Sequence, residues 1–588
     1  MSPSTENAVA DIASSLIGAV IASTGLVETT EVARRPLQLN GNCQILSLGS
    51  VLDPARMNAG PYRTDVISMV SPADIWKKGL NPALDAFEDR SVLRLSPENE
   101  RVLRHAQGRR LLSSTVNAYI GVGERVTGFG AGGSESMTIF LHRDGDTRTI
   151  VRKILSEALT TAHWNPEGEG VMLPPFAKAR KQAEYLQALP ESVREIFPEV
   201  YDVLERDIPV PPHLQADGKA SYREVIYEMS YVTGEEVSRY IEKYSPPPAV
   251  IARLYEQIFG ILYRNVHSVN RVPADGETLE ASYFRKIEDR LALCRLTAPN
   301  TFGPDLLDSE QIVINGTPYL NAGALLSRFR AHPEWLEVLE PRSHSLVMGD
   351  TNTENIKLAD ITTLQQAQDV IESGASQAAI DQAIAAITPE ALGIKFLDPR
   401  AIGFESDGAG TRDDAMYDNK PWHNSIGHYD EIHFEQFRLQ VATAPGTTPS
   451  VGIEFFEGNP YQRAYQVRDV TPAGAPVDNA SPRGMEDYFK PVMTAAYDLD
   501  DPDSRYLAED PYWLVRFVFV MGTHFTAMPP FHFQAELDGS LRDTYGAQRR
   551  PVAIYCEGIK WLNWALEMLE GTRTTFLGFD VPPIGVDA

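Results

Sequence analysis

Three consecutive prolines at 246–248 separate two kinds of hydrophobic pattern in this chain of 588 residues. Before them, from about 116 onward, short apolar runs alternate with polar residues and are interrupted by glycines, which is typical of a twisted antiparallel sheet. After them, residues 250–266 carry apolar side chains three and four positions apart, which predicts a helix. The change of period predicts an α+β fold, with a sheet followed by a mainly helical region.

The same two periods locate further elements. Strands are predicted over the ranges 44–48, 118–120, 138–141, 149–154, 225–232, 345–348 and 394–397. Helices are predicted over the ranges 8–27, 97–112, 176–189, 362–387, 513–527 and 551–569. The segment 443–483, rich in Pro, Gly and Thr, is predicted to be irregular.

The composition indicates which binding partners are not expected and in which cellular compartment the protein is expected. Acidic residues outnumber basic ones by 80 to 53, a formal net charge of −27, so broad binding to nucleic acid or anionic lipid is not expected. The three cysteines form no CxxC pair, so neither a disulfide framework nor a structural zinc site is predicted. No apolar run is long enough to span a membrane and no signal peptide is recognised, so we expect a cytoplasmic protein.

Gly128, Gly130 and Gly133 lie between two predicted strands. A loop without side chains lets backbone N–H groups approach a phosphate closely, so these glycines are candidate nucleotide contacts. The alternative is a flexible hairpin loop. No helix follows the glycines, which disfavours a dinucleotide-binding fold.

Lys153 follows Arg152 in the predicted strand 149–154. Alternation places Lys153 on the face opposite Arg152, and a lysine that points inward needs an anionic partner. A nucleotide phosphate is one candidate, held together with Glu184 of the predicted helix 176–189. The alternatives are a solvated lysine on an edge strand and a glutamate on a helix surface.

Two predicted strands run into aspartates, because Asp350 closely follows 345–348 and Asp398 follows 394–397. Asn355 lies five positions after Asp350. Metal-assisted phosphoryl transfer requires such a set: one carboxylate accepts the proton of the attacking hydroxyl, and an amide oxygen and a second carboxylate hold Mg²⁺. The alternative is that both aspartates only form turns.

From about residue 115 to the C-terminus the chain resembles protein-kinase-like small-molecule phosphotransferases of the aminoglycoside and choline type, and most closely a bacterial branch associated with capsular polysaccharide. The stretches that carry the resemblance are 181–189 with 196–198, then 227–231, 397–400, and 417–420 leading to 425–430. The resemblance implies a bilobal fold, with an antiparallel-sheet N-lobe and hinge over 116–245 and a helical C-lobe over 246–588. ATP and Mg²⁺ would bind in the cleft between the lobes, and residues 1–115 would be an extension of unknown role.

The resemblance also implies roles for matching positions. Asp350 would be the catalytic base, and Asn355 and Asp398 would bind Mg²⁺. The expected ATP contacts are Gly128, Gly130, Gly133, Lys153 with its ion-pair partner Glu184, and the backbone from Glu228 through Ser230 to Tyr231. The matching positions Arg400, Asp418 and His428 are either substrate contacts or struts of the catalytic loop, and we favour struts.

The chain departs from the family pattern in two places. Met348 stands where a histidine is usual, which removes a hydrogen-bonding anchor of the catalytic loop. The 47 residues between Asp350 and Asp398 exceed the usual short hairpin, so we expect the inserted helices to cover or extend one side of the active site and to shape substrate choice.

We therefore predict an ATP- and Mg²⁺-dependent phosphotransferase that acts on a hydroxyl of a small polar molecule, such as a sugar or sugar derivative. One alternative is a catalytically idle nucleotide-binding or scaffold protein. A protein kinase is the other, disfavoured because no Ala-Pro-Glu segment follows Asp398. His423, His428 and His433 match no trusted metal-ligand spacing and are expected to be structural.

Overall fold

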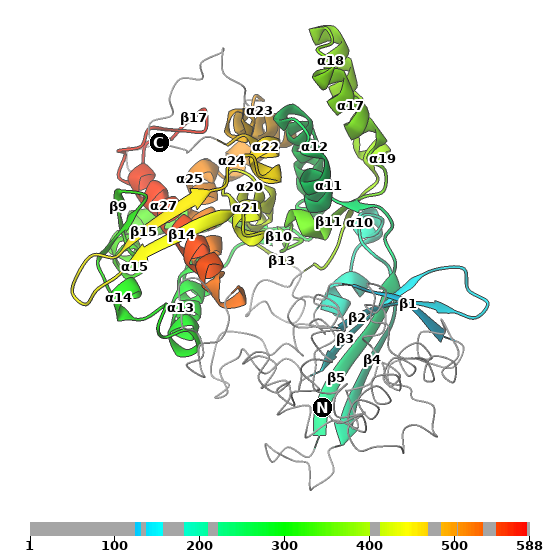
Figure 1. The fold of residues 1–588 in the computed structure, drawn as a ribbon, viewed down its shortest axis with the longest axis horizontal. Helices are drawn as coiled ribbons and strands as arrows, with labels where there is room; N and C mark the ends of the chain where they lie inside the picture. Colours follow the sequence, from blue (N-terminus) through cyan, green and yellow to red (C-terminus); the bar gives the residue numbers. More distant parts are fainter. Residues whose placement is uncertain are drawn as a thin grey trace, which may run out of the picture. The chain divides into compact units, whose positions relative to one another are not determined.

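The structure is a computed structural model that describes residues 124–130, 137–156, 182–209, 221–399, 412–467, 484–501, 504–532 and 548–584 (Figure 1). These residues form a mixed α+β protein with antiparallel sheets and many helices, as predicted. They fall into two compact units. The first ends at Tyr231 and excludes Glu184–Pro198, which belong to the second unit together with the chain from Val232 onward. The elements predicted over 8–27, 44–48, 97–112 and 118–120 lie outside the described residues.

The first unit contains a five-stranded antiparallel sheet in the order β1-β2-β3-β5-β4. Its strands are β1 Glu124–Gly130, β2 Met137–Arg143, β3 Ile150–Ser156, β4 Val200–Pro209 and β5 Ser221–Ser230. The three strands predicted here fall within or largely overlap β2, β3 and β5. Strands β3 and β5 pair over seven residues, and each buries side chains on both faces of the sheet.

The second unit is mainly helical. Its α-helices are α10 Glu191–Arg194, α11 Val237–Tyr244, α12 Pro248–Ile261, α13 Arg285–Thr297, α14 Pro304–Leu307, α15 Ala322–Arg330, α16 Pro333–Leu339, α17 Thr362–Glu372, α18 Gln377–Ala385, α19 Pro389–Leu392, α20 Lys420–Asn424, α21 Tyr429–His433, α22 Pro460–Tyr465, α23 Met485–Tyr497, α24 Arg505–Glu509, α25 Trp513–Thr526 and α27 Arg549–Leu569. Its shorter helical turns are η6 Leu262–Val266, η7 Leu279–Phe284, η8 Thr353–Asn355, η9 Ala415–Asp418 and η10 Pro529–Phe531.

Small sheets lie between these helices. Their strands are β6 Glu235–Glu236, β7 Val272–Pro273, β8 Gln311–Ile314, β9 Thr317–Leu320, β10 Ser343–Leu346, β11 Ile356–Leu358, β12 Ile394–Phe396, β13 Arg412–Asp413, β14 Phe437–Ala442, β15 Ser450–Phe455, β16 Thr575–Phe576 and β17 Phe579–Asp580. The described strand orders are β13-β10-β7, β12-β11-β6, β14-β15-β8-β9 and β16-β17. Only the pair β15–β8 among them is parallel.

Helices α25 and α27 form the centre of the second unit, and every residue of α25 is buried. Their backbones approach closely at two glycines. A Cβ on Gly522 would lie 2.7 Å from the backbone nitrogen of Leu562, and one on Gly558 would lie 2.5 Å from that of Thr526. Both predicted helices are confirmed, and their apolar stripes are core, because each helix buries almost its whole surface.

Helix α12 begins with Pro248 at its first position, where the missing N–H costs no hydrogen bond. It continues without a break into the π-helical turn η6, so the predicted helix over 250–266 is confirmed. The two elements end next to His267, whose ring is buried. The helix therefore delivers this histidine to the interior of the second unit.

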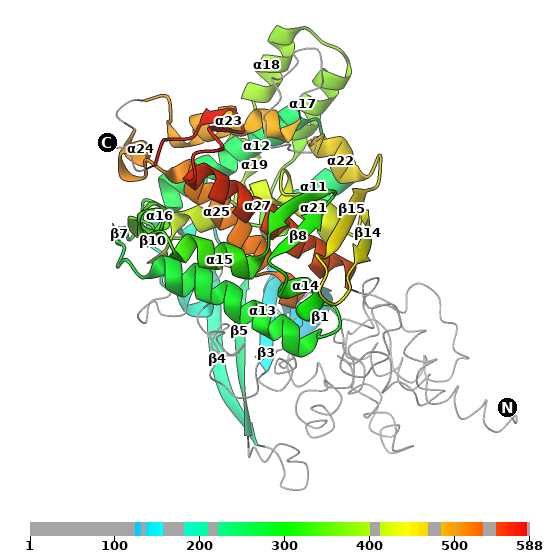
Figure 2. The ribbon, with the colours of Figure 1, turned by 90° about the vertical axis from the view of Figure 1, so that its left-hand side faces the viewer.

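The predicted helical insertion is also confirmed, as α17, α18 and α19 between β11 and β12. It rests on the neighbouring helices through Arg253 Nε, which donates to Ile387 O at 3.2 Å, and Gln368 Nε2, which donates to Tyr244 O at 3.1 Å. Figures 1 and 2 show α17 and α18 projecting outward, and α18 has no buried residue. The insertion extends the second unit beside α12. Helix α18 lies far from β10, the strand that leads to Asp350, in both views.

One prediction about this unit is wrong. The segment 443–483 was expected to be irregular, but it contains β15 and α22. Val451 and Ile453 alternate into the core against β14, and Asn459 caps α22 ahead of Pro460. Turn-forming residues at both ends of this segment hid a short alternating strand.

Candidate functional site

The loop that follows β10 is held by Asp418, the last residue of η9. Its carboxylate accepts hydrogen bonds from the backbone N–H groups of Met348 and Gly349, each at 2.7 Å. Its backbone carbonyl accepts from Thr351 Oγ1 at 2.7 Å, and His267 Nε2 lies 2.9 Å from Asp418 Oδ2. Both carboxylate oxygens of the buried Asp418 accept from backbone N–H groups, so Asp418 acts as a strut of this loop.

A second anchor comes from Tyr185, whose hydroxyl donates to Val347 O at 2.7 Å. Burial, helped by the charge of Asp418, raises the pKa of this hydroxyl well above its ordinary value, so it stays a donor. Met348 is fully buried and its backbone is fixed by Asp418. The anchor that a histidine at 348 would supply is therefore supplied from other elements.

Asp350 ends this loop and is 2% exposed. Its Oδ1 accepts from Lys420 Nζ at 2.7 Å and from Asn352 Nδ2 at 2.8 Å. Lys420, the first residue of α20, also donates to Gly349 O at 3.1 Å. A buried ammonium beside a buried carboxylate favours the ionised form of both groups, and an ionised carboxylate is what a general base needs.

Asn355 connects Asp350 to the second aspartate. Its Nδ2 donates to Asp350 O at 3.0 Å, and its backbone carbonyl accepts from Leu397 N at 2.7 Å. The register of β11 with β12, Ile356 opposite Phe396, continues this pairing. The hairpin therefore brings Asp350, Asn355 and Asp398 to one end of the two strands, although a helical insertion separates them in sequence.

Asp398 adopts a left-handed backbone conformation, with φ of 51°. Few residues other than glycine adopt this conformation, and aspartate tolerates it better than most. Such backbone conformations cluster at functional sites, where the surrounding structure enforces them. This conformation places Asp398 at a bend directly after β12.

The residues at this end fit a magnesium ion by their chemistry. The amide of Asn355 uses its nitrogen on Asp350 O, which leaves its oxygen as the coordinating atom, and Asp398 contributes a carboxylate. Among the described residues, no group of three or more His, Cys, Asp or Glu could hold a metal. Mg²⁺ takes one or two protein oxygens and completes its shell with phosphate and water, so the amide oxygen of Asn355 and the carboxylate of Asp398 are the atoms that would hold it.

A polar and aromatic cluster that the sequence did not indicate lies beside the loop. Glu354 Oε1 is 3.4 Å from His433 Nε2, and Tyr429 OH is 3.4 Å from both His433 Nδ1 and His532 Nε2. Burial would raise the pKa of Glu354, but the hydrogen bond and charge of His433 lower it. Burial, followed by the charges of Glu354 and Asp350, raises the pKa of Tyr429 well above its ordinary value, so these groups share one electrostatic neighbourhood.

The turn η8 is supported from behind by a buried carboxyl. Asn424 accepts from Thr353 N at 3.3 Å and donates to Asp430 Oδ1 at 2.5 Å. Tyr465 OH donates to Asp430 Oδ2 at 2.5 Å. Burial raises the pKa of Asp430 to about 7.

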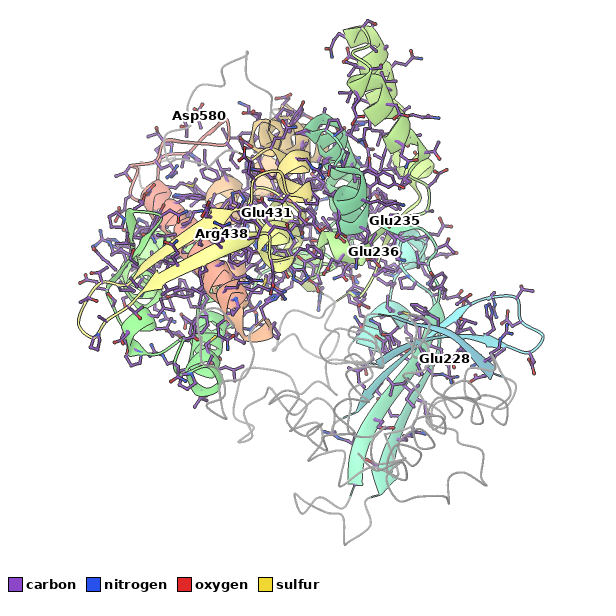
Figure 3. All side chains as sticks on the ribbon, viewed as in Figure 1. Glu228, Glu235, Glu236, Glu431, Arg438 and Asp580 are labelled. Carbon is purple, nitrogen blue, oxygen red and sulfur yellow. The ribbon has the colours of Figure 1, made fainter. Side chains whose placement is uncertain are left out.

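His423, His428 and His433 have separate partners. His423 Nε2 contacts Met521 O at 3.2 Å, and burial with the charge of Lys420 lowers its pKa to about 3. His428 Nδ1 contacts Glu431 Oε2 at 2.6 Å, in the interior of the second unit (Figure 3). His433 instead contacts Glu354 of the turn η8.

In the first unit, Gly128 and Gly130 are part of β1, opposite Phe140 and Thr138 of β2, rather than part of the connecting loop. The strand extends to Gly130 because β1 pairs with β2 on both sides of a bulge between Val126 and Gly128. Gly133 and Arg400 lie outside the described residues.

Lys153 is buried, and lies opposite Thr138 and Tyr227 in the sheet. Arg152 points to the other face, as alternation predicted, where its guanidinium pairs with Glu228. Tyr227 OH, on the face of Lys153, donates to Gln182 of the short helix 182–187.

The remaining predicted ATP contacts are Glu184, Glu228 and Ser230. Glu184 lies in the helix 182–187 and is exposed. The side chain of Glu228, labelled in Figure 3, also pairs with Arg143 at 2.6 Å. Ser230 N donates to Glu199 O at 2.8 Å, and its hydroxyl accepts from Glu199 N at 2.9 Å.

No protein-family model matches the chain, and no curated protein matches it. Helices long and apolar enough to cross a membrane do not occur in the described part of the chain. What the chain does must therefore be inferred from the side chains gathered at the ends of β10 and β12.

Proposed function

We propose that this chain is an ATP- and Mg²⁺-dependent phosphotransferase that acts on a hydroxyl of a small polar molecule. The observation that supports the proposal is the meeting of Asp350, Asn355 and Asp398 at one end of the β11–β12 hairpin. If Asp350 and Asp398 only formed turns, they would not need to lie at the same end of the hairpin. The loop of Asp350 would also not need the hydrogen bonds that it receives from the buried Asp418 and Tyr185.

Each residue has a part in the proposed reaction. The oxygen of the acceptor hydroxyl forms a bond to the γ-phosphorus of ATP, and Asp350 accepts the proton that this hydroxyl loses. The bond from that phosphorus to the bridging oxygen breaks, and ADP leaves with the electron pair. Asn355 and Asp398 would hold Mg²⁺, which supplies positive charge to the triphosphate when bound. The struts from Asp418 and Tyr185 keep Asp350 in place, so that no loop ordering is needed during the reaction.

Further nucleotide contacts belong to the proposal through the family resemblance. They are Gly128, Gly130, Gly133, Lys153, Glu184 and the backbone of Glu228 to Tyr231. Lys153 is buried in β3, and a buried ammonium group is stabilised by an anionic partner such as a phosphate rather than by water. Lys153→Met is expected to weaken ATP binding, and unchanged affinity would remove Lys153 from the proposal.

The cluster beside the loop supports a small, hydroxyl-rich acceptor such as a sugar or sugar derivative. Tyr429, His433 and His532 present rings with polar atoms, which suit molecules with both apolar faces and hydroxyl groups. His433 and Glu354 are partly exposed, so an acceptor can reach them.

The test is calorimetric titration of ATP into the full chain, with and without Mg²⁺, before any acceptor is known. Wild type is expected to bind ATP only with Mg²⁺, and Asp398→Ala is expected to lose this binding. Asp369→Ala, which removes an exposed carboxylate from α17, is the matched control and should bind like wild type. Absence of ATP binding by wild type under every condition would refute the proposal.

Turnover separates an enzyme from an idle nucleotide-binding protein. If Asp350→Asn binds Mg·ATP but no longer transfers phosphate to a sugar panel that wild type labels, Asp350 is the base. Binding without transfer to any acceptor, by both proteins, would instead favour a scaffold. Strong labelling of a peptide library by wild type would point to a protein kinase.

A further inference from the structure

The loop that contains Asp350 receives its positive charge from a residue distant in the sequence. Residues 349–355 read Gly-Asp-Thr-Asn-Thr-Glu-Asn and contain no lysine or arginine. Lys420 supplies an ammonium from α20, 2.7 Å from Asp350 Oδ1 and 3.1 Å from Gly349 O. Both Lys420 and Asp350 are nearly fully buried, so this contact is weakened little by solvent.

The same short segment holds the adjacent residues 348–350 with two opposite charges. Asp418 accepts from the N–H groups of Met348 and Gly349, and two residues later Lys420 donates to Gly349 O and to Asp350. Asp418 therefore holds the backbone, whereas Lys420 reaches the reacting carboxylate itself.

A second buried lysine lies close to the first. Lys420 Nζ is 5.3 Å from the centre of the Tyr417 ring, and Lys286 Nζ is 4.4 Å from it. The chain has gathered two ammonium groups at this ring although its formal net charge is −27, and one of the two, that of Lys420, also contacts Asp350. The charge of Lys420 also contributes to lowering the pKa of His423.

We propose that Lys420 binds the transferred phosphoryl group of ATP and shares its ammonium between that group and Asp350. The inference rests on the proposed phosphotransfer. The acceptor oxygen must come within about 2.6–3.2 Å of the Asp350 carboxylate to give up its proton, and within about 3–3.5 Å of the γ-phosphorus to attack it. An ammonium 2.7 Å from Asp350 Oδ1 is then within reach of a phosphoryl oxygen.

The arrangement also strengthens as the reaction proceeds. When the acceptor proton passes to Asp350, the carboxylate becomes neutral and competes less for the ammonium. The ammonium is then available to the phosphoryl oxygens while the bond to ADP breaks and the bond to the acceptor forms. A contact that is stronger in the transition state than in the ground state accelerates the reaction.

The experiment compares binding of ATP and ADP, each with Mg²⁺, by calorimetry. Lys420→Met is expected to weaken ATP binding about tenfold or more and to change ADP binding less than about twofold, because only ATP carries the group that Lys420 contacts. Lys420→Arg, which keeps the charge, should restore most of the ATP affinity. Asp350→Asn should bind ATP more tightly than wild type does, because the carboxylate no longer competes.

Lys286→Met is the matched control, since it removes the other buried ammonium from the Tyr417 ring. It should leave the ratio of ATP to ADP affinity unchanged. If Lys420→Met does not fold, the comparison is made between Asp350→Asn and Asp350→Asn with Lys420→Met, where residue 350 carries no charge. The added Lys420 change should again lower ATP affinity selectively.

Two results are distinguished. If Mg·ATP binds wild type but Lys420→Met changes ATP and ADP equally, or changes neither, the role of Lys420 is overturned and the proposed phosphotransfer stands. If wild type binds no nucleotide, the proposed function fails and this inference fails with it.

Discussion

Asp418→Asn tests whether one buried carboxylate holds the loop that contains Asp350. The change keeps the size of the side chain but replaces one acceptor oxygen by an NH₂ donor. In wild type, the two carboxylate oxygens accept from Met348 N and Gly349 N, each at 2.7 Å. In the variant, one of these two backbone N–H groups faces another donor.

The magnitude follows from these two contacts. A hydrogen bond to a charged group contributes about 1.5–3 kcal/mol, and a buried donor left without an acceptor costs about 1–3 kcal/mol. The two terms overlap because they describe one N–H group. We therefore expect the free energy of unfolding of the second unit to fall by about 2–4 kcal/mol.

The measurement is urea unfolding at neutral pH, followed by tryptophan fluorescence, since the buried Trp422 lies on α20 next to this loop. Asp369→Asn, on the exposed surface of α17, is the control and should unfold like wild type. Turnover by Asp418→Asn should fall together with stability, because the same N–H groups orient Asp350. A change in unfolding free energy below about 0.5 kcal/mol, the usual range for surface substitutions, would refute this account of the loop.

Three further perturbations probe the second unit by equilibrium unfolding. Burial raises the pKa of Asp430 to about 7, so the folded state binds this proton more tightly than the unfolded state does. The free energy of unfolding should therefore fall as the pH rises from about 4 to 7. Asp430→Asn should reduce that fall, and an unchanged pH dependence in the variant would contradict this role of Asp430. Gly522→Ala should cost about 1–3 kcal/mol, because its Cβ would lie 2.7 Å from the backbone of Leu562, and wild-type stability would show that α25 and α27 separate easily. Arg516→Met should cost about 3–5 kcal/mol by leaving the buried Asp414 without its guanidinium, and a neutral result would mean that Asp414 is not ionised.

Local periodicity was sufficient for the regular elements. The strands β2, β3 and β5 and the helices α12, α25 and α27 follow from alternation or from apolar stripes, since both depend only on neighbouring residues. The position of Lys153 opposite Arg152 follows from the same alternation. The segment 443–483 shows the limit, because its turn residues masked the short strand β15.

The sequence by itself determined the α+β class, the helical insertion and the positions of Asp350 and Asp398 after strands, because each depends on residues close together in the chain. Only the tertiary structure decided which charges meet. Lys420 reaches Asp350 and Asp418 reaches Gly349, pairs that are 70 and 69 residues apart, and no local pattern encodes them. Such pairs form because a buried charge must find a partner of opposite sign, and which partner it finds depends on how the whole chain packs.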